Sequence, residues 1–139
     1  MSKRSRVREV VLQILYQEDL NPDADIGVSE RFLRGRLKHN EDLVLFGRSL
    51  LVGARLHRKA IDAKIEAFAD NWSLARMAVT DRNVLRIGAY EILFSDTPDR
   101  VAINEAVELS KRFGSKHSPQ FVNGILDRVL KSKQSNASG

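Results

Sequence analysis

Residues 101–130 read VAINEAVELSKRFGSKHSPQFVNGILDRVL, and this stretch decides the fold. Its apolar residues recur at spacings of three and four, which places them on one face of a helix. Gly114 predicts the end of one helix, and Ser118 followed by Pro119 predicts the start of the next. The two apolar stripes consist of Ala102, Ile103, Ala106, Val107, Leu109 and Phe113, and of Val122, Ile125, Leu126 and Val129. The stretch is therefore predicted to form a helix, a short polar turn and another helix.

The rest of the chain carries the same periodicity. Apolar residues recur at helical spacing in residues 7–15, 28–37, 43–54, 61–68 and 84–93. No alternation of period two is long enough to predict a strand. We therefore expect an all-α fold, a single compact domain of about six to seven helices over residues 1–131. Residues 132–139 contain no apolar residue except Ala137, so we expect a disordered tail.

Three residues within these helices and their links carry expectations about packing. Gly47 and Gly53 lie in the predicted helix over residues 43–54, where glycine lowers helix stability, so we expect close packing against a neighbouring helix in compensation. Trp72 is the only tryptophan, and it is interpreted as an anchor that packs the loop between two helices onto the core.

The composition indicates a soluble cytoplasmic protein. A chain of 139 residues with 42% hydrophobic content is long enough to bury a core. It has no cysteine, which excludes disulfides, thiolate zinc sites and cysteine nucleophiles and suits a reducing compartment. No apolar run approaches the roughly 20 residues that span a bilayer. The basic N-terminus lacks the apolar segment of a secretory signal, so no membrane association is expected.

The charge favours a polyanionic partner. Twenty-three Lys and Arg residues against eighteen Asp and Glu residues give a net charge of +5 and an isoelectric point near 9.8. The first predicted helix begins with a group of cations, Lys3, Arg4, Arg6 and Arg8. At 100° per residue, Gln13 and Tyr16 lie opposite its apolar stripe, and a tyrosine pointing away from the core needs a reason.

This pattern suits single-stranded nucleic acid. The cations would contact phosphates, the Tyr16 ring would stack on a base, and Gln13 could bond a base edge. The alternative is a solvated helix face on which Tyr16 folds back over its own helix. The helix dipole disfavours cations at a helix N-terminus, which is weak support for a ligand that needs them there.

Enzyme motifs are missing from the sequence. The three histidines, His39, His57 and His117, lie far apart and outside any metal motif. The segment 114–116, Gly-Ser-Lys, has the wrong order for a phosphate-binding loop. We therefore expect no catalytic residue, no metal site and no cofactor.

Four sequence blocks resemble the NusB family of bacterial transcription antitermination factors. They are REVVLQILY at 8–16, DRNVLRIGAYE at 81–91, AINEAVELSK at 102–111 and FVNGILD at 121–127. The resemblance implies that the N-terminal helix and its tyrosine bind boxA, a single-stranded element of nascent ribosomal RNA. It also implies a partner, the ribosomal protein NusE, and action on elongating RNA polymerase with other Nus factors.

Further site candidates lie around the last turn. Lys116, Gln120 and Phe121 are additional candidates for RNA contact, with a loop lysine and a core-edge phenylalanine as the alternative interpretations of Lys116 and Phe121. Asp81, an acid at a helix start, is a candidate for contact with the basic ribosomal protein.

Three rival interpretations stay open. The first is a helical adaptor whose only ligand is another protein. The second is the RNA-binding module of a ribosomal RNA cytosine methyltransferase system, because such enzymes carry a NusB-like domain. The third, a homodimer formed through the glycine-bearing helix at 43–54, is compatible with both RNA binding and the adaptor.

Overall fold

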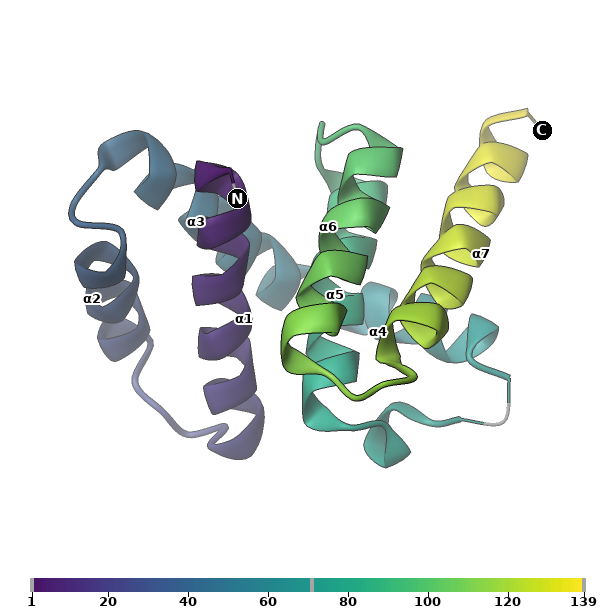
Figure 1. The fold of residues 1–139 in the computed structure, drawn as a ribbon, viewed down its shortest axis with the longest axis horizontal. Helices are drawn as coiled ribbons and strands as arrows, with labels where there is room; N and C mark the ends of the chain where they lie inside the picture. The colour runs from purple at the N-terminus through teal and green to yellow at the C-terminus, as the bar shows by residue number, and fades with distance from the viewer. Residues whose placement is uncertain (1, 71, 139) are drawn as a thin grey trace.

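The computed structural model describes residues 2–70 and 72–138, which form an all-α domain without strands (Figure 1). Its elements are α1 (Lys3–Leu20), α2 (Ile26–Arg36), α3 (Glu41–Leu56), α4 (Arg58–Phe68), the short 3-10 helix η1 (Leu74–Arg76), α5 (Val79–Phe94), α6 (Asp99–Phe113) and α7 (Ser118–Ser138). The predicted all-α fold of six to seven helices is confirmed. None of the helices in the described part of the chain has the length and apolar character that crossing a bilayer requires.

Helix α5 is the centre of the domain. It packs against α1, α3, α4, α6 and α7, and its Val84, Leu85 and Ile92 are completely buried. In Figure 1, α1, α2 and α3 lie on one side of it, and α7 lies on the other. Because α1 contacts α2 and α3 as well as α5 and α6, it joins the two sides of the molecule.

The turn between α6 and α7 confirms the predicted helix–turn–helix, and Gly114 directly follows the first of the two helices as predicted. Gly114 follows the last residue of α6 and has a φ of −96°, so it does not adopt the left-handed conformation that ends many helices. A Cβ at this position would lie 2.5 Å from Ser118 Oγ and 2.8 Å from the Ser110 carbonyl oxygen. The turn therefore requires glycine for lack of space. Ser118 Oγ accepts a hydrogen bond of 2.9 Å from the Ser115 amide and fixes the turn.

The expected close packing at the α3 glycines is confirmed. A Cβ on Gly53 would lie 2.1 Å from the ring of Tyr90, and one on Gly47 would lie 2.8 Å from the side chain of Leu33. Both glycines are thus used for packing within the chain. The exposed face of α3 carries other residues.

Two expectations about the outlying segments are corrected. The segment expected to be a disordered tail continues α7 as helix to Ser138, while Gly139 lies outside the described residues. Lys133 anchors its first part, because its Nζ donates to the Ile92 carbonyl at 2.8 Å and lies 2.9 Å from Asp99 Oδ1. Trp72 is 53% exposed and does not anchor its loop; the neighbouring Leu74 is buried instead.

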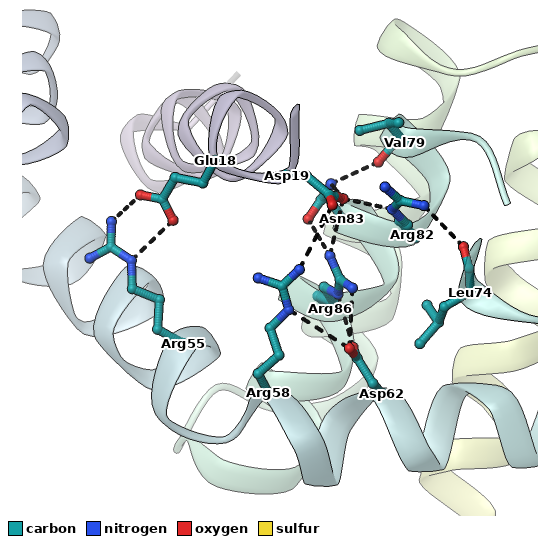
Figure 2. A network of polar contacts seen from close by, with 10 residues as sticks. All are labelled: Glu18, Asp19, Arg55, Arg58, Asp62, Leu74, Val79, Arg82, Asn83 and Arg86. Atoms are coloured by element: carbon teal, nitrogen blue, oxygen red, sulfur yellow. Dashed lines mark hydrogen bonds and ion pairs between the residues drawn. The ribbon is translucent and has the colours of Figure 1, made fainter. Parts of the chain in front are cut away.

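A polar network holds the C-terminal end of α1 (Figure 2). Asp19 Oδ2 accepts hydrogen bonds from Arg82 Nε at 2.6 Å, Asn83 Nδ2 at 2.9 Å and Arg86 Nη1 at 3.2 Å. Arg86 also donates to both carboxylate oxygens of Asp62, which links α1 and α5 to α4. Burial raises the pKa of the Asp19 carboxyl. Its hydrogen bonds and the charges of the nearby arginines together lower the pKa by more than burial raises it, so this pKa lies below its ordinary value.

A buried ion pair holds the other end of α1. Arg8 Nε and Nη2 donate to the two carboxylate oxygens of Glu91 on α5, at 2.7 and 2.8 Å. The Glu91 carboxylate also accepts from Thr97 Oγ1 at 2.7 Å, and Glu105 lies 3.6 Å from Arg8 Nη1. With both ends fixed to α5, the opposite face of α1 is held in a defined orientation.

Candidate nucleic-acid interface

The outer face of α1 is open to solvent. Lys3, Arg4, Arg6 and Gln13 are exposed, and Tyr16 is 37% exposed. Tyr16 follows Gln13 by three residues, so the two side chains lie on the same face of the helix. The surface predicted to remain uncovered is therefore present in the structure.

The middle of this face lines a surface hollow with a volume of about 540 Å³. Three helices supply its polar and aromatic side chains: Arg6, Glu9, Gln13 and Tyr16 from α1, Arg36 from α2, and Arg112 and Phe113 from α6. Thr80 at the start of α5 completes the wall. The hollow combines three cations, one carboxylate, one amide and two aromatic rings, and this excess of cations beside aromatic rings suits single-stranded nucleic acid.

A buried carboxylate lies between two of these cations. Glu9 is 9% exposed and contacts Arg6 Nη1 at 3.4 Å, and it also forms a close ion pair with Arg112 Nη1. The arginine from α6 thus covers Glu9 on α1. Glu9 orients both guanidinium groups at the edge of the hollow, and the charge of this trio remains positive.

Arg8 does not belong to this surface. Its side chain is 3% exposed, and its guanidinium is held by Glu91. Contact with a phosphate would require breaking a buried ion pair and leaving Glu91 without its partner, which is strongly unfavourable. The assignment of Arg8 to phosphate contact is therefore wrong.

Arg4 and Lys3 extend the basic surface toward the N-terminus of α1. The Arg4 guanidinium lies over the Phe46 ring of α3, 4.3 Å from its centroid, so it stacks on the protein while it stays exposed. Lys3 is exposed in the first turn of the helix. Their contact with RNA stays a prediction.

The three candidate RNA-binding residues around the last turn lie in two separate parts of the surface. Lys116 is exposed in the turn between α6 and α7, just after Phe113. Gln120 and Phe121 line a separate hollow of about 320 Å³, together with Trp72 and Arg128. Phe121 packs against the core, as the core-edge interpretation expects. The structure does not bring Gln120 and Phe121 into the hollow beside α1.

Asp81 is less accessible than a partner-binding acid would be. It lies in the first turn of α5 and is half-buried, and its Oδ1 has no hydrogen-bond partner among the described residues. Its contact with a protein partner stays a prediction.

Two cationic residues and one aromatic residue of the hollow, Arg36, Arg112 and Phe113, were not predicted as site residues from the sequence. Arg36 and Arg112 lie 20 or more residues from the basic group at the N-terminus, and only the packing of α2 and α6 against α1 brings them there. Phe113 was assigned to the core stripe, but it is 48% exposed, which corrects that assignment. Its place at the end of α6, past the last buried turn, is the signal that would have found it.

Comparison with known proteins gives consistent matches over nearly the whole chain. A family model described as the NusB family matches residues 5–131. The transcription antitermination protein NusB of Anaeromyxobacter dehalogenans (strain 2CP-1) is 44% identical over 128 residues, which cover 92% of this chain and 90% of that protein. The solved structure of T. maritima NusB has a TM-score of 0.82 and 39% identity, covering 92% of this chain and 90% of that one. A structure of the antitermination factors NusB and NusE in complex with double-stranded RNA has a TM-score of 0.78 and 27% identity, covering 95% and 98%.

Proposed function

This chain belongs to the NusB family and is a transcription antitermination factor, and we propose that it binds single-stranded boxA-like RNA in the hollow beside α1. The observation that carries the proposal is the convergence of Arg6, Arg36 and Arg112 with the rings of Tyr16 and Phe113 around one hollow. Such a surface can attract a phosphate backbone and stack bases at the same time.

Different side chains of the hollow would contact different parts of the RNA. The guanidinium groups contact phosphates and supply affinity that depends on salt. The Tyr16 ring offers a flat surface for one base, and the exposed Phe113 ring offers a second. Gln13 lies between the cations and the Tyr16 ring on the same helix and is the side chain placed to read a base edge.

A protein partner completes the proposed assembly. The similar structure that contains NusB and NusE with RNA supports the proposal that this chain also pairs with NusE. The pair would act in the cytoplasm on the RNA polymerase elongation complex with other Nus factors. A second protein that contacts the same RNA raises the effective concentration of both and tightens the complex without new contacts in the hollow.

The proposed mechanism contains no chemical step. The relatives that show the family are named as antitermination proteins, which are not enzymes. We propose that this chain likewise acts by assembly, without making or breaking a bond.

The test is a titration of the full chain with a labelled single-stranded RNA that contains a boxA-like element, with and without NusE. A scrambled RNA of the same composition is the matched control. We expect tighter binding of the boxA-like RNA, a dependence on salt, and a gain in affinity with NusE. Equal affinity for the two RNAs at all salt concentrations would contradict sequence-specific RNA binding, and a failure to bind either RNA would favour the protein-only adaptor.

Self-association is a second proposal that one observation supports. The exposed face of α3 carries Leu45, Val52 and Leu56, an apolar row at helical spacing. The glycines that first suggested this helix face inward, so a homodimer would use the opposite face. Sedimentation velocity of the wild type and of Val52→Glu would show a dimer that the variant loses, and a monomer at all concentrations would refute it.

A further inference from the structure

We infer that Arg36 is a positioning residue that holds the Gln13 amide with its N–H groups toward the RNA, so that the hollow selects a base with a keto oxygen, uracil or guanine. This inference rests on the proposed RNA-binding function and assigns the specificity of the same site. It concerns a residue on α2, outside the N-terminal basic group.

The contact between the two side chains fixes the orientation of the amide. Arg36 Nη1 donates a hydrogen bond of 3.1 Å to Gln13 Oε1. A guanidinium has only donors, so the atom of Gln13 that faces it is the carbonyl oxygen. The usual uncertainty between the oxygen and nitrogen of a glutamine amide is thereby removed. The Gln13 Nε2 group points away from Arg36, and it forms no hydrogen bond within residues 2–70 and 72–138.

A second contact restrains Arg36. Its guanidinium lies over the Phe32 ring, 5.5 Å from the centroid, and Phe32 packs against the core. Arg36 is also in the last turn of α2, where a cation is favoured by the helix dipole. The guanidinium is thus held by a ring on one side and by the Gln13 oxygen on the other.

The oriented amide determines what the hollow can read. Both free N–H groups of Gln13 are donors, and the Tyr16 ring lies one turn further along the same face of α1. A base stacked on Tyr16 turns an edge toward Gln13. The O4 of uracil and the O6 of guanine accept from such donors, whereas the amino groups at the same positions of cytosine and adenine oppose them. If the Gln13 amide oxygen faced the RNA instead, it would accept from the amino groups of cytosine and adenine, and the preference would be reversed.

The inference is tested by replacing single atoms of the RNA. The boxA-like RNA is synthesised with one uridine at a time replaced by 4-thiouridine, or one guanosine replaced by 6-thioguanosine, so that sulfur, a weaker acceptor, replaces O4 or O6 while the ring N–H is kept. The wild type should lose about threefold to tenfold in affinity at one position, the value of one hydrogen bond. For Gln13→Ala and for Arg36→Ala, the modified base at that position should leave the RNA affinity unchanged. The double variant should likewise bind the modified and unmodified RNA equally.

Arg36→Lys separates the effect of Arg36 on the orientation of the Gln13 amide from the effect of its positive charge. It keeps the positive charge but loses the planar group that stacks on Phe32, so we expect an unchanged salt dependence together with a weakened discrimination at that one base. Circular dichroism confirms the fold of each variant. If Arg36→Ala binds every RNA more weakly and retains the full discrimination, Arg36 is only a phosphate contact and the inference is wrong. If the wild type fails to distinguish the boxA-like RNA from the scrambled one, the proposed function itself fails, and the inference falls with it.

Discussion

Arg6 and Arg8 are the same residue type two positions apart on one helix, yet they belong to different parts of the molecule. The side chain of Arg6 is 50% exposed and contacts Glu9 at 3.4 Å, whereas that of Arg8 is 3% exposed and forms two short hydrogen bonds with Glu91. Two residues correspond to a rotation of about 200° around a helix, so one arginine faces solvent and the other faces α5. A basic group in a sequence can therefore contain both ligand-binding and structural cations.

The C-terminal half of α1 repeats the contrast. Tyr16 lies in the hollow and is partly exposed, and Asp19 binds three side chains of α5 (Figure 2). The inner face thus fixes the helix, and the outer face is left for a partner. Changes on the inner face should affect the free energy of unfolding, and changes on the outer face should affect RNA affinity.

The largest effect is expected for Glu91→Ala on the inner face. This change leaves the buried Arg8 guanidinium without a partner, which should lower the free energy of unfolding by about 3–5 kcal/mol. Urea denaturation measures it, with Arg6→Ala as the matched control that should change stability by less than about 0.5 kcal/mol. Equal stability of the two variants would remove the distinction between the faces.

Asp19→Asn should have a smaller effect that depends on pH. We expect a loss of about 2–3 kcal/mol at neutral pH, because the charge that accepts from Arg82, Asn83 and Arg86 is removed. In the unfolded chain the carboxyl of Asp19 has its ordinary pKa of 3.8, and in the folded chain its pKa is lower. Its contribution to stability is therefore complete above that value and is lost as the pH falls through the folded pKa.

The measurement is the free energy of unfolding as a function of pH. The difference between the wild type and Asp19→Asn should begin to shrink as the pH falls below about 4, because Asp19 is protonated in the unfolded chain before it is protonated in the folded chain. A difference that stays constant from neutral to acidic pH would mean that the network contributes through packing alone.

Tyr16→Ala tests the outer face. It should lower RNA affinity by about 1–3 kcal/mol, because the ring that stacks on a base is removed. Tyr16→Phe keeps the ring and should bind close to the wild type. Fluorescence titration measures the affinities, and thermal unfolding should be little changed in either variant. An equal loss in both would assign the effect to the hydroxyl and reject stacking.

The smallest effect is expected for Arg6→Ala. If Arg6 contacts one phosphate, the slope of log K against log salt should fall by about 0.7, the value for a single strand. Arg6→Lys keeps the charge and should keep the slope. An unchanged slope in Arg6→Ala would remove Arg6 from the RNA contact and leave Arg36 and Arg112 as the cations of the hollow.

The periodicity of apolar residues was sufficient to predict the helices, and the geometry of one helix was sufficient to predict that Gln13 and Tyr16 face outward. Helical geometry alone could not predict the burial of residues at the border of the apolar stripe. Arg8 lies at that border, and its burial depends on Glu91, which is 83 residues away in the sequence. Arg36 and Arg112 join the hollow for the same reason, since only the packing of other helices brings them there. Residues whose environment is set by distant partners cannot be placed from spacing alone.

The distance along the chain between α1 and its anchors also has a consequence for synthesis. The side chains that hold Arg8 and Asp19 follow them by 83 residues and by 63–67 residues. A ribosome must therefore translate α5 before α1 can dock, although α1 is made first. The RNA-facing surface is completed only late in translation, and a nascent chain interrupted before α5 cannot present it in its final orientation.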